Sequence, residues 1–234
     1  MRVRPVWPFA ALLVIWGNAV PWLLGPTARL PGGSWAFVAA GVLLVVISLI
    51  TARAAGLTTV TLGLDLRRSP RGAAIGAIVV VAAIVGLAAI RIAAFVVGHP
   101  VAYQPVLEVS GDELVRHLVF FLPFGGVLPE EIAFRGTLLG MMAGRYGTRS
   151  ALVASAATFA LWHGIVIVST IGATTIAPPS PWAAPAMIGA LGAVFGGGVV
   201  FAALRLRTGT IASSIVAHWG FNAVLLAGLR AIAA

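Results

Sequence analysis

Seven stretches of consecutive apolar residues follow one another along the 234-residue chain, separated by short polar connections. A helix needs about 20 apolar residues to cross the roughly 30 Å hydrocarbon core of a bilayer. Because no polar stretch is long enough to fold by itself, the pattern predicts an all-α, polytopic membrane helix bundle in a single domain, residues 1–234. The predicted spans are residues 6–24, 35–55, 72–97, 114–143, 150–168, 185–204 and 210–232.

The fourth stretch is long for one crossing and contains Pro123 and Pro129. Proline disrupts the interior of a helix but is accepted in its first turn. We therefore expect a kink or a break in this stretch, with Pro129 in the first turn of a new helical segment. If the stretch forms two separate helices, the chain has eight spans instead of seven.

The composition agrees with a chain that has the bilayer as its solvent. Hydrophobic residues make up 60% of the sequence and charged residues 9%, whereas soluble domains contain about 25% charged residues. With no cysteine in the chain, a disulfide framework, a thiolate nucleophile and a cysteine metal site are excluded. All 15 basic residues are arginine, which we interpret as the codon bias of a GC-rich bacterial genome and not as nucleic-acid binding.

The arginines indicate the orientation of the spans. Ten of them precede the first span, lie in alternate connections or, in the case of Arg53, lie in the last turn of the span before such a connection. The opposite side holds only Arg29 and Arg230. The positive-inside rule then predicts an inner-membrane protein with a cytoplasmic N-terminus. No small-residue cleavage site follows the first apolar stretch, so we expect a retained span and not a signal peptide. The ten arginines are Arg2, Arg4, Arg53, Arg67, Arg68, Arg71, Arg145, Arg149, Arg205 and Arg207.

Two adjacent carboxylates, Glu130 and Glu131, interrupt the fourth span. Insertion of a charged side chain into the bilayer centre is unfavourable by about 2.5–3.5 kcal/mol, so such residues mark pairs, water-lined cavities or chemistry. On a helix, Glu131 and Arg135 share a face, which predicts an ion pair. Glu130 points about 100° away and is a candidate general base. The alternative is a purely structural ion pair with Glu130 facing solvent.

Two further polar sites lie at a similar depth. At 1.5 Å per residue, His163 and Glu130 lie about 21 and 22 Å from the arginine-rich edge. His218 and Asn222, on one face of the last span, lie about 16 and 22 Å from it. Three separate helices thus bring polar groups to one level, although a buried core histidine or hydrogen bonds between helices also explain each site singly. We assign His117, near the outer surface, to structure.

Three motifs occur in this order along the chain, on the fourth, fifth and seventh predicted spans: Glu-Glu-x-x-x-Arg, Phe-x-x-x-His and His-x-x-x-Asn. This ordered set resembles the CAAX-protease and bacteriocin-processing (CPBP) family of intramembrane proteases, which includes the type II CAAX prenyl endopeptidases and the Abi-type proteins. The resemblance covers residues 114–232, which we expect to be the catalytic core. The residues that carry it are Glu130, Glu131, Arg135, Phe159, His163, His218 and Asn222.

The resemblance implies an endopeptidase of the glutamic type. Glu130 and His163 would activate a water for peptide hydrolysis, and His218 and Asn222 would stabilise the oxyanion. Its partners would be membrane lipids and a peptide or membrane-anchored protein substrate, without nucleic acid and without a cofactor. The supporting residues would be Glu131 and Arg135, which hold the first motif, and Phe159, which shapes the pocket beside His163.

Three alternatives use the same residues. Glu130, His163 and His218 could ligate one zinc ion with an open position for water, although the His-Glu-x-x-His motif of many zinc proteases is missing. Glutamate and histidine chains also form the relays of proton-coupled transporters, although no convincing inverted repeat is visible. The third alternative is a non-catalytic immunity or scaffold protein.

Overall fold

The computed structural model describes residues 6–25, 30, 33–65, 67–96 and 102–233. Within them it consists of helices joined by turns and loops, with one isolated bridge between Tyr103 and Thr174 and no strand. Six helices are long and apolar enough to cross a membrane, and a seventh span results if the bent pair α8 and α9 counts as one. The predicted polytopic all-α bundle is confirmed. Its spanning elements are α1 (Val6–Leu24), α2 (Trp35–Ala54), α3 (Ser69–Val96), the run Gly111–Tyr146, α8 (Thr148–Trp162), α9 (Gly164–Gly172), α10 (Ala183–Thr208) and α11 (Ala212–Ala233).

The fourth stretch is one uninterrupted helical run, so the alternative with eight spans is wrong. The run contains two π-helical segments, and the first of them contains Pro123: the amide of Leu128 bonds to the carbonyl of Pro123, five residues earlier. Such local π adjustments satisfy backbone groups that proline would otherwise leave free in lipid. Pro129 lies in the first turn of a new segment, as predicted. The run consists of α5 (Gly111–Arg116), η2 (His117–Val127), α6 (Leu128–Glu131), η3 (Ile132–Leu138) and α7 (Leu139–Tyr146), preceded by the short α4 (Gln104–Glu108).

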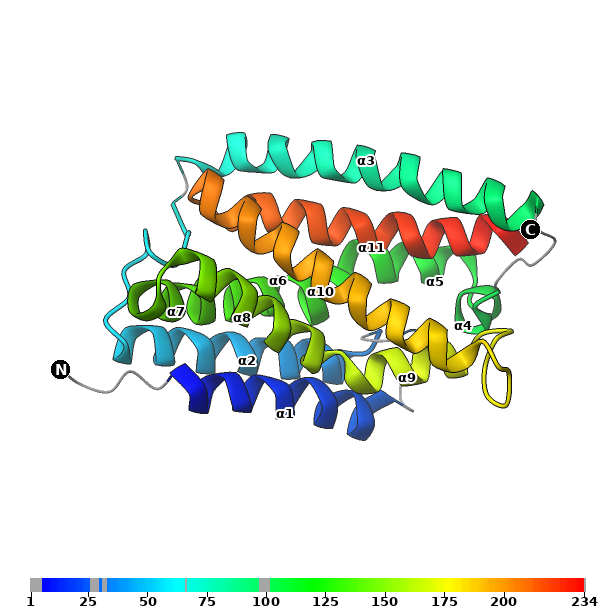
Figure 1. Ribbon diagram of the computed structural model, residues 1–234, viewed down its shortest axis with the longest axis horizontal. Helices are drawn as coiled ribbons and strands as arrows, with labels where there is room; N and C mark the ends of the chain where they lie inside the picture. Colours follow the sequence, from blue (N-terminus) through cyan, green and yellow to red (C-terminus); the bar gives the residue numbers. More distant parts are fainter. Residues whose placement is uncertain (1–5, 26–29, 31–32, 66, 97–101, 234) are drawn as a thin grey trace.

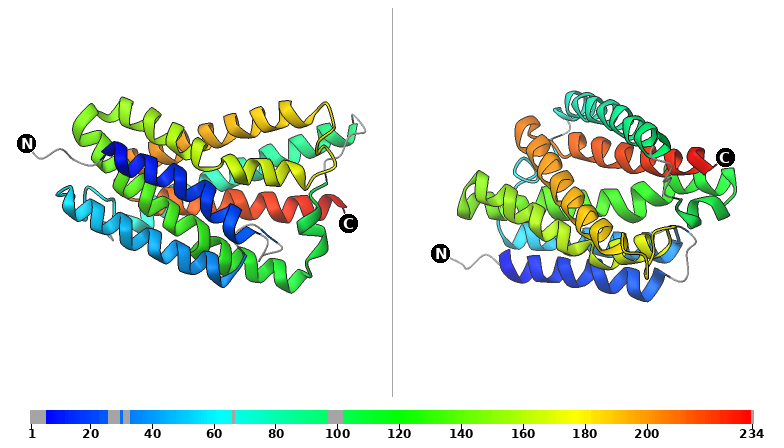
Figure 2. Two further views of the ribbon diagram at one scale, coloured as in Figure 1. Left: turned by 90° about the horizontal axis from the view of Figure 1, so that it is seen from below. Right: turned by 45° about the vertical axis from the view of Figure 1, so that its right-hand side comes forward.

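The bundle has three tiers around the long helical run (Figures 1 and 2). On one side α3 lies along α11, and on the other α1 and α2 lie together, with α2 against η2 and η3 and α1 against α8 and α9. Gly76 allows the close contact of α3 with α11, because a Cβ there would lie only 3.0 Å from the Cβ of Val216. The long run and α8 are thereby enclosed from both sides.

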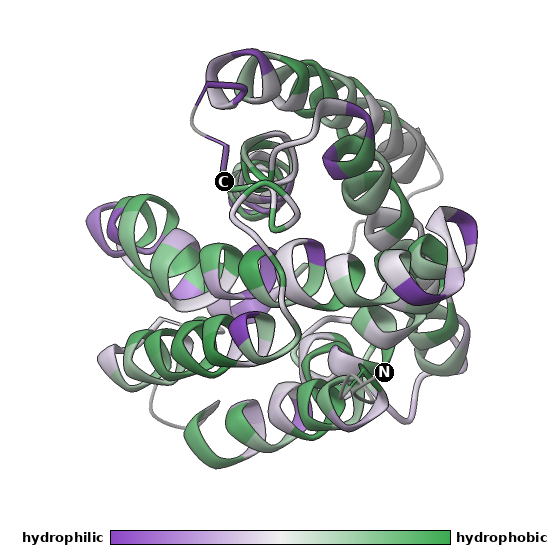
Figure 3. Ribbon diagram, turned by 90° about the vertical axis from the view of Figure 1, so that its left-hand side faces the viewer, coloured by the Kyte–Doolittle hydropathy of each residue, from purple (hydrophilic) through white to green (hydrophobic). Residues whose placement is uncertain are grey.

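Most of the described arginines gather at one end of the bundle, on the left of Figure 1, whereas Arg230 in the last turn of α11 lies at the opposite end. The arginine-rich end contains the last turns of α2, α7 and α10 and the connections that follow them. Figure 3 looks onto it and shows hydrophilic residues at the ends of mainly hydrophobic helices. The arrangement agrees with the alternation predicted from the sequence. Arg2, Arg4, Arg29 and the predicted end of the third span at residue 97 lie outside the described residues.

Candidate active site

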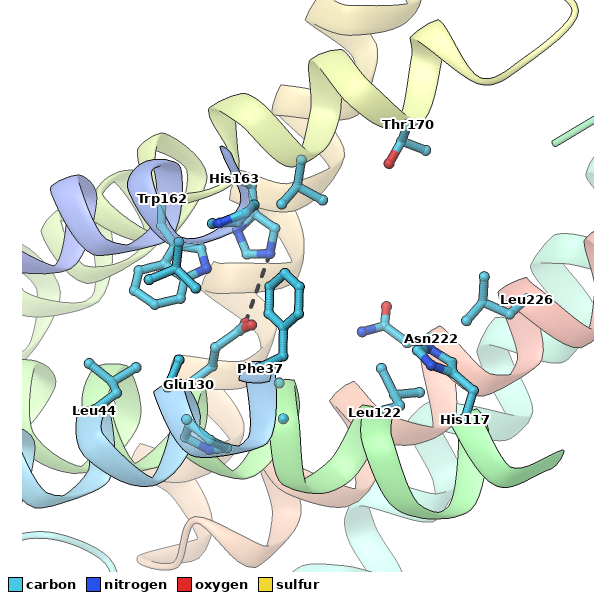
Figure 4. Close-up of a pocket in the computed structure, with 18 of the residues that line it drawn as sticks. Phe37, Leu44, His117, Leu122, Glu130, Trp162, His163, Thr170, Asn222 and Leu226 are labelled. Carbon is cyan, nitrogen blue, oxygen red and sulfur yellow. Dashed lines mark ion pairs between the residues drawn. The ribbon is translucent and has the colours of Figure 1, made fainter. Parts of the chain in front are cut away.

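A cavity of about 290 Å³ lies between α1, α2, the η2–α6 region, α8–α9 and α11. We call it the Glu130 cavity (Figure 4). Apolar side chains such as Phe37, Leu122 and Leu225 form most of its wall. The polar residues along it are Tyr103, His117, Glu130, His163, Thr170 and Asn222.

Glu130 lies between two imidazoles. Its Oε2 atom is 3.8 Å from Nε2 of His163 and 4.0 Å from Nε2 of His218. This oxygen is buried and, within the described part of the chain, has no hydrogen-bond partner. The structure therefore brings together the three helices whose polar residues were expected at one depth.

Glu131 is held by an ion pair and a hydrogen bond. Its Oε1 is 3.2 Å from Nη1 of Arg135, which confirms the predicted ion pair. The same oxygen is 2.9 Å from Nδ1 of His218. Glu131 and Arg135 are almost completely buried, with 0% and 1% exposure, so each charge depends on the other for compensation.

Phe159 packs against two polar side chains of the site, His163 and Arg135. Its ring packs edge-on against the imidazole of His163 at 4.5 Å between centroids, and the guanidinium of Arg135 lies 4.0 Å from its centroid. The other face of the cluster is closed by Phe201, which stacks on His218 at 4.8 Å. Phe159 contacts His163 but does not line the Glu130 cavity itself.

His163 lies at the point where the fifth span bends. Helices α8 and α9 meet there at 46°, and the amide of His163 bonds to the carbonyl of Ala160 in a tightened last turn. The carbonyl of Phe159 is therefore free to accept a hydrogen bond from Nδ1 of the imidazole, at 2.8 Å. The bend thus supplies the acceptor that orients the histidine ring.

Asn18 of α1 satisfies the other backbone groups at this bend. Its Nδ2 donates to the carbonyl of Leu161 at 2.9 Å, and its Oδ1 accepts from the amide of Ile165 at 2.9 Å. Gly164 lies directly beneath, where a Cβ would be 2.8 Å from Oδ1 of Asn18. In lipid no water is available for these groups, so Asn18 stabilises the bend that presents His163.

The hydrogen bonds of the two histidines define where their protons lie. A carbonyl can only accept, so Nδ1 of His163 carries the hydrogen that bonds to Phe159. Nδ1 of His218 likewise donates to the carboxylate of Glu131. In the neutral form of each ring, Nε2 therefore presents a lone pair toward Glu130.

The remaining polar residues lie across the cavity. Figure 4 shows Glu130 and His163 on one side and Asn222 and His117 on the other, with Phe37 in between. His117 is 3% exposed, and its buried Nδ1 has no hydrogen-bond partner among the described residues. His117, which we had assigned to a structural role, also lines the Glu130 cavity.

The described residues contain no group of three His, Asp or Glu side chains arranged to hold a metal ion. Zinc bonds of about 2.0–2.1 Å place neighbouring ligand atoms about 3.3 Å apart. Here Oε2 of Glu130 is 3.8 Å from Nε2 of His163 and 4.0 Å from Nε2 of His218. In this arrangement the set is wider than zinc coordination.

Comparison with known proteins identifies the segment that carries this cluster. Residues 113–224 match the family described as type II CAAX prenyl endopeptidase Rce1-like. These residues form an Rce1-like domain. The match confirms the resemblance found from the three motifs, and the matched family is described as one of endopeptidases. The apolar helices make the chain a multi-pass membrane protein. No curated protein and no solved structure matches the chain.

The Rce1-like domain contains every predicted site residue, but the structure adds a residue from outside it. Asn18 lies in α1, and sequence reasoning overlooked it. A signal was present, since an asparagine inside an apolar span is a polar group that lipid disfavours. The contact with the bend in α8–α9 depends on tertiary packing and has no signature of its own in the sequence.

Proposed function

We propose that the chain hydrolyses a peptide bond within the membrane, using a water held between Glu130 and His163. The observation that carries this proposal is the 3.8 Å separation of Glu130 Oε2 and His163 Nε2. A direct hydrogen bond needs about 2.7–3.2 Å, and both atoms are acceptors when the carboxylate is ionised and the imidazole neutral. A water donates two hydrogen bonds, so one molecule bridges two acceptors at this spacing.

The bridging water is the nucleophile in this proposal. Its two hydrogens point at Glu130 and His163, which leaves its lone pairs directed away from both. As the water attacks the substrate carbonyl, Glu130 accepts its proton as the general base and His163 orients it. The same proton is then available for the leaving amine.

The oxyanion that forms on the substrate requires donors. Asn222 presents an amide to the cavity, and an amide donates without any change of protonation. Nε2 of His218 donates only when the ring carries a second proton, because Nδ1 already carries the hydrogen that bonds to Glu131. We assign both residues to oxyanion stabilisation.

The surroundings favour a membrane-bound substrate. Most of the Glu130 cavity is apolar, so a peptide that carries a lipid or a transmembrane segment fits it better than a charged soluble peptide. The arginine-rich end of the bundle would face the cytoplasm, with the N-terminus on that side of the inner membrane. Prenylated peptides that end in a CAAX motif are the first substrates to test, because the matched family is named for them.

The test is cleavage by purified protein in liposomes, with a farnesylated CAAX peptide and its unprenylated form as substrates. Glu130→Gln and His163→Ala should abolish cleavage while both variants keep the Tm and the monodisperse profile of the parent. Full activity in Glu130→Gln would refute the mechanism. A chelator that abolishes activity, with recovery on added zinc, would replace the glutamic mechanism with the zinc alternative.

A further inference from the structure

A second cavity, of about 410 Å³, lies at the arginine-rich end of the bundle, away from Glu130. The segment between α2 and α3, helix α7 and the last turn of α10 form its walls. We call it the arginine cavity, since Arg68 and Arg205 are its charged residues. It also presents the apolar side chains of Leu57, Val60 and Leu206. No carboxylate is among the described residues that line it.

Arg205 is a buried cation without a buried anion. Arg205 is 8% exposed. Its Nη2 donates a hydrogen bond to the carbonyl of Thr61 at 2.6 Å. Its Nε is buried with no hydrogen-bond partner, and none of the described carboxylates pairs with it. A buried charge that lacks an opposite charge is strongly unfavourable, so an anion in the cavity would supply what the chain does not.

Arg68 provides a second, more accessible guanidinium. Its Nε is 3.3 Å from Oδ2 of Asp65, and its side chain is 59% exposed. The guanidinium groups of Arg68 and Arg205 therefore have only one described carboxylate near them, that of Asp65. The pair retains a net positive charge for a ligand.

Two glycines with positive φ make room for these guanidinium groups. At Gly63, where φ is +74°, a Cβ would lie 2.9 Å from Cζ of Arg205. At Gly209, where φ is also +74°, a Cβ would lie 2.5 Å from Nη1 of Arg68. Any side chain at either position would displace a guanidinium, so the backbone is shaped around both.

We propose that the arginine cavity binds a phosphate group, either that of an anionic lipid or free phosphate. Guanidinium forks match phosphate oxygens and form strong charge-assisted hydrogen bonds. Basic sites between spans on the cytoplasmic side suit lipid headgroups. The apolar wall of Leu57, Val60 and Leu206 favours the lipid, because it offers contacts to glycerol and acyl carbons that free phosphate lacks. This site is independent of the proposed hydrolysis.

The experiment compares the purified protein in detergent with dioleoyl phosphatidylglycerol, dioleoyl phosphatidylcholine and inorganic phosphate, by Tm and by native mass spectrometry. Phosphatidylglycerol should raise the Tm and remain bound, whereas phosphatidylcholine should not. A similar rise with inorganic phosphate would assign the site to free phosphate. No rise with either anion would overturn the proposal.

The matched variants are Arg68→Gln and Arg67→Gln, which remove one charge from adjacent positions. Arg68→Gln should weaken phosphatidylglycerol binding about tenfold, while Arg67, which is exposed and does not line the cavity, should be replaceable without effect. Equal losses in both variants would mean a diffuse surface potential and would also overturn the proposal. Arg205→Lys keeps the charge but loses the fork, and it should weaken binding even where the protein folds normally.

Discussion

His218 donates a hydrogen bond from Nδ1 to the carboxylate of Glu131 across 2.9 Å, and this bond joins α11 to α6 in the middle of the bundle. The same carboxylate pairs with Arg135 at 3.2 Å. Glu131 therefore compensates a buried guanidinium and fixes an imidazole at once. Its neighbour Glu130 faces the cavity, and its Oε2 has no hydrogen-bond partner among the residues that the structure describes. The two adjacent glutamates therefore have different roles.

Replacement of Glu131 by Gln should destabilise the protein by about 3–5 kcal/mol, because it leaves Arg135 as an uncompensated buried charge. Chemical unfolding in detergent micelles measures this loss. Glu130→Gln is the matched control: it makes the same chemical change one residue earlier, where Oε2 has no hydrogen-bond partner in the described structure. It should keep the stability of the parent, and equal losses in the two variants would contradict the division of tasks.

Replacement of Asn18 by Leu should lower both stability and activity. The carbonyl of Leu161 and the amide of Ile165 would each lose a partner, at about 1–3 kcal/mol for each group. Thermal unfolding and the cleavage assay measure the two effects. Ala11→Leu places the same side chain at an exposed position of α1 and should change neither. A fully active Asn18→Leu would show that the bend holds without α1.

Gly164→Ala should act on the same bend from the other side. The added Cβ would lie 2.8 Å from Oδ1 of Asn18, and such overpacking typically destabilises by about 1–3 kcal/mol. Gly172→Ala is the control in the same half-helix, because a Cβ there meets no atom within 4 Å. The difference in Tm between the two variants is the readout, and equal values would refute the close contact.

Asn222→Ala should lower kcat by about 10²–10³-fold if its amide serves the oxyanion. KM should change little, since the oxyanion forms only in the transition state. Thr170→Val removes another polar group from the wall of the same cavity and should leave kcat unchanged. A rise in KM at constant kcat in Asn222→Ala would instead make Asn222 a substrate-binding residue.

Much of the fold follows from the sequence because span length is a local property. The first span was predicted with its observed bounds, Val6–Leu24, and the second to within a residue of Trp35–Ala54. A new helical segment begins at Pro129 as expected, whereas the 46° bend at His163 was not expected. π-helical segments can absorb a proline, whereas the bend at His163 depends on a contact with α1 that no local pattern contains.

In the candidate site, too, contacts within one helix were predictable from the sequence, whereas the atomic contacts between helices were not. The pair of Glu131 with Arg135 was predictable, since four residues separate them on one helix. The similar depth of Glu130, His163 and His218 along their helices also predicted correctly that the three residues lie close together. That His218 binds Glu131 with Nδ1 and turns Nε2 to Glu130 was not predictable, because it depends on how α11 is rotated against α6.

Because Asn18 stabilises the bend at His163, the smallest segment of the chain that keeps the site intact must include α1. The matched segment, residues 113–224, holds every proposed catalytic group, yet the bend that carries His163 is completed by a side chain about a hundred positions earlier. A fragment trimmed to the matched segment would turn a backbone carbonyl and an amide toward lipid, at several kcal/mol for each. Transplanting this centre into another bundle would therefore require a first helix with an amide at the matching height.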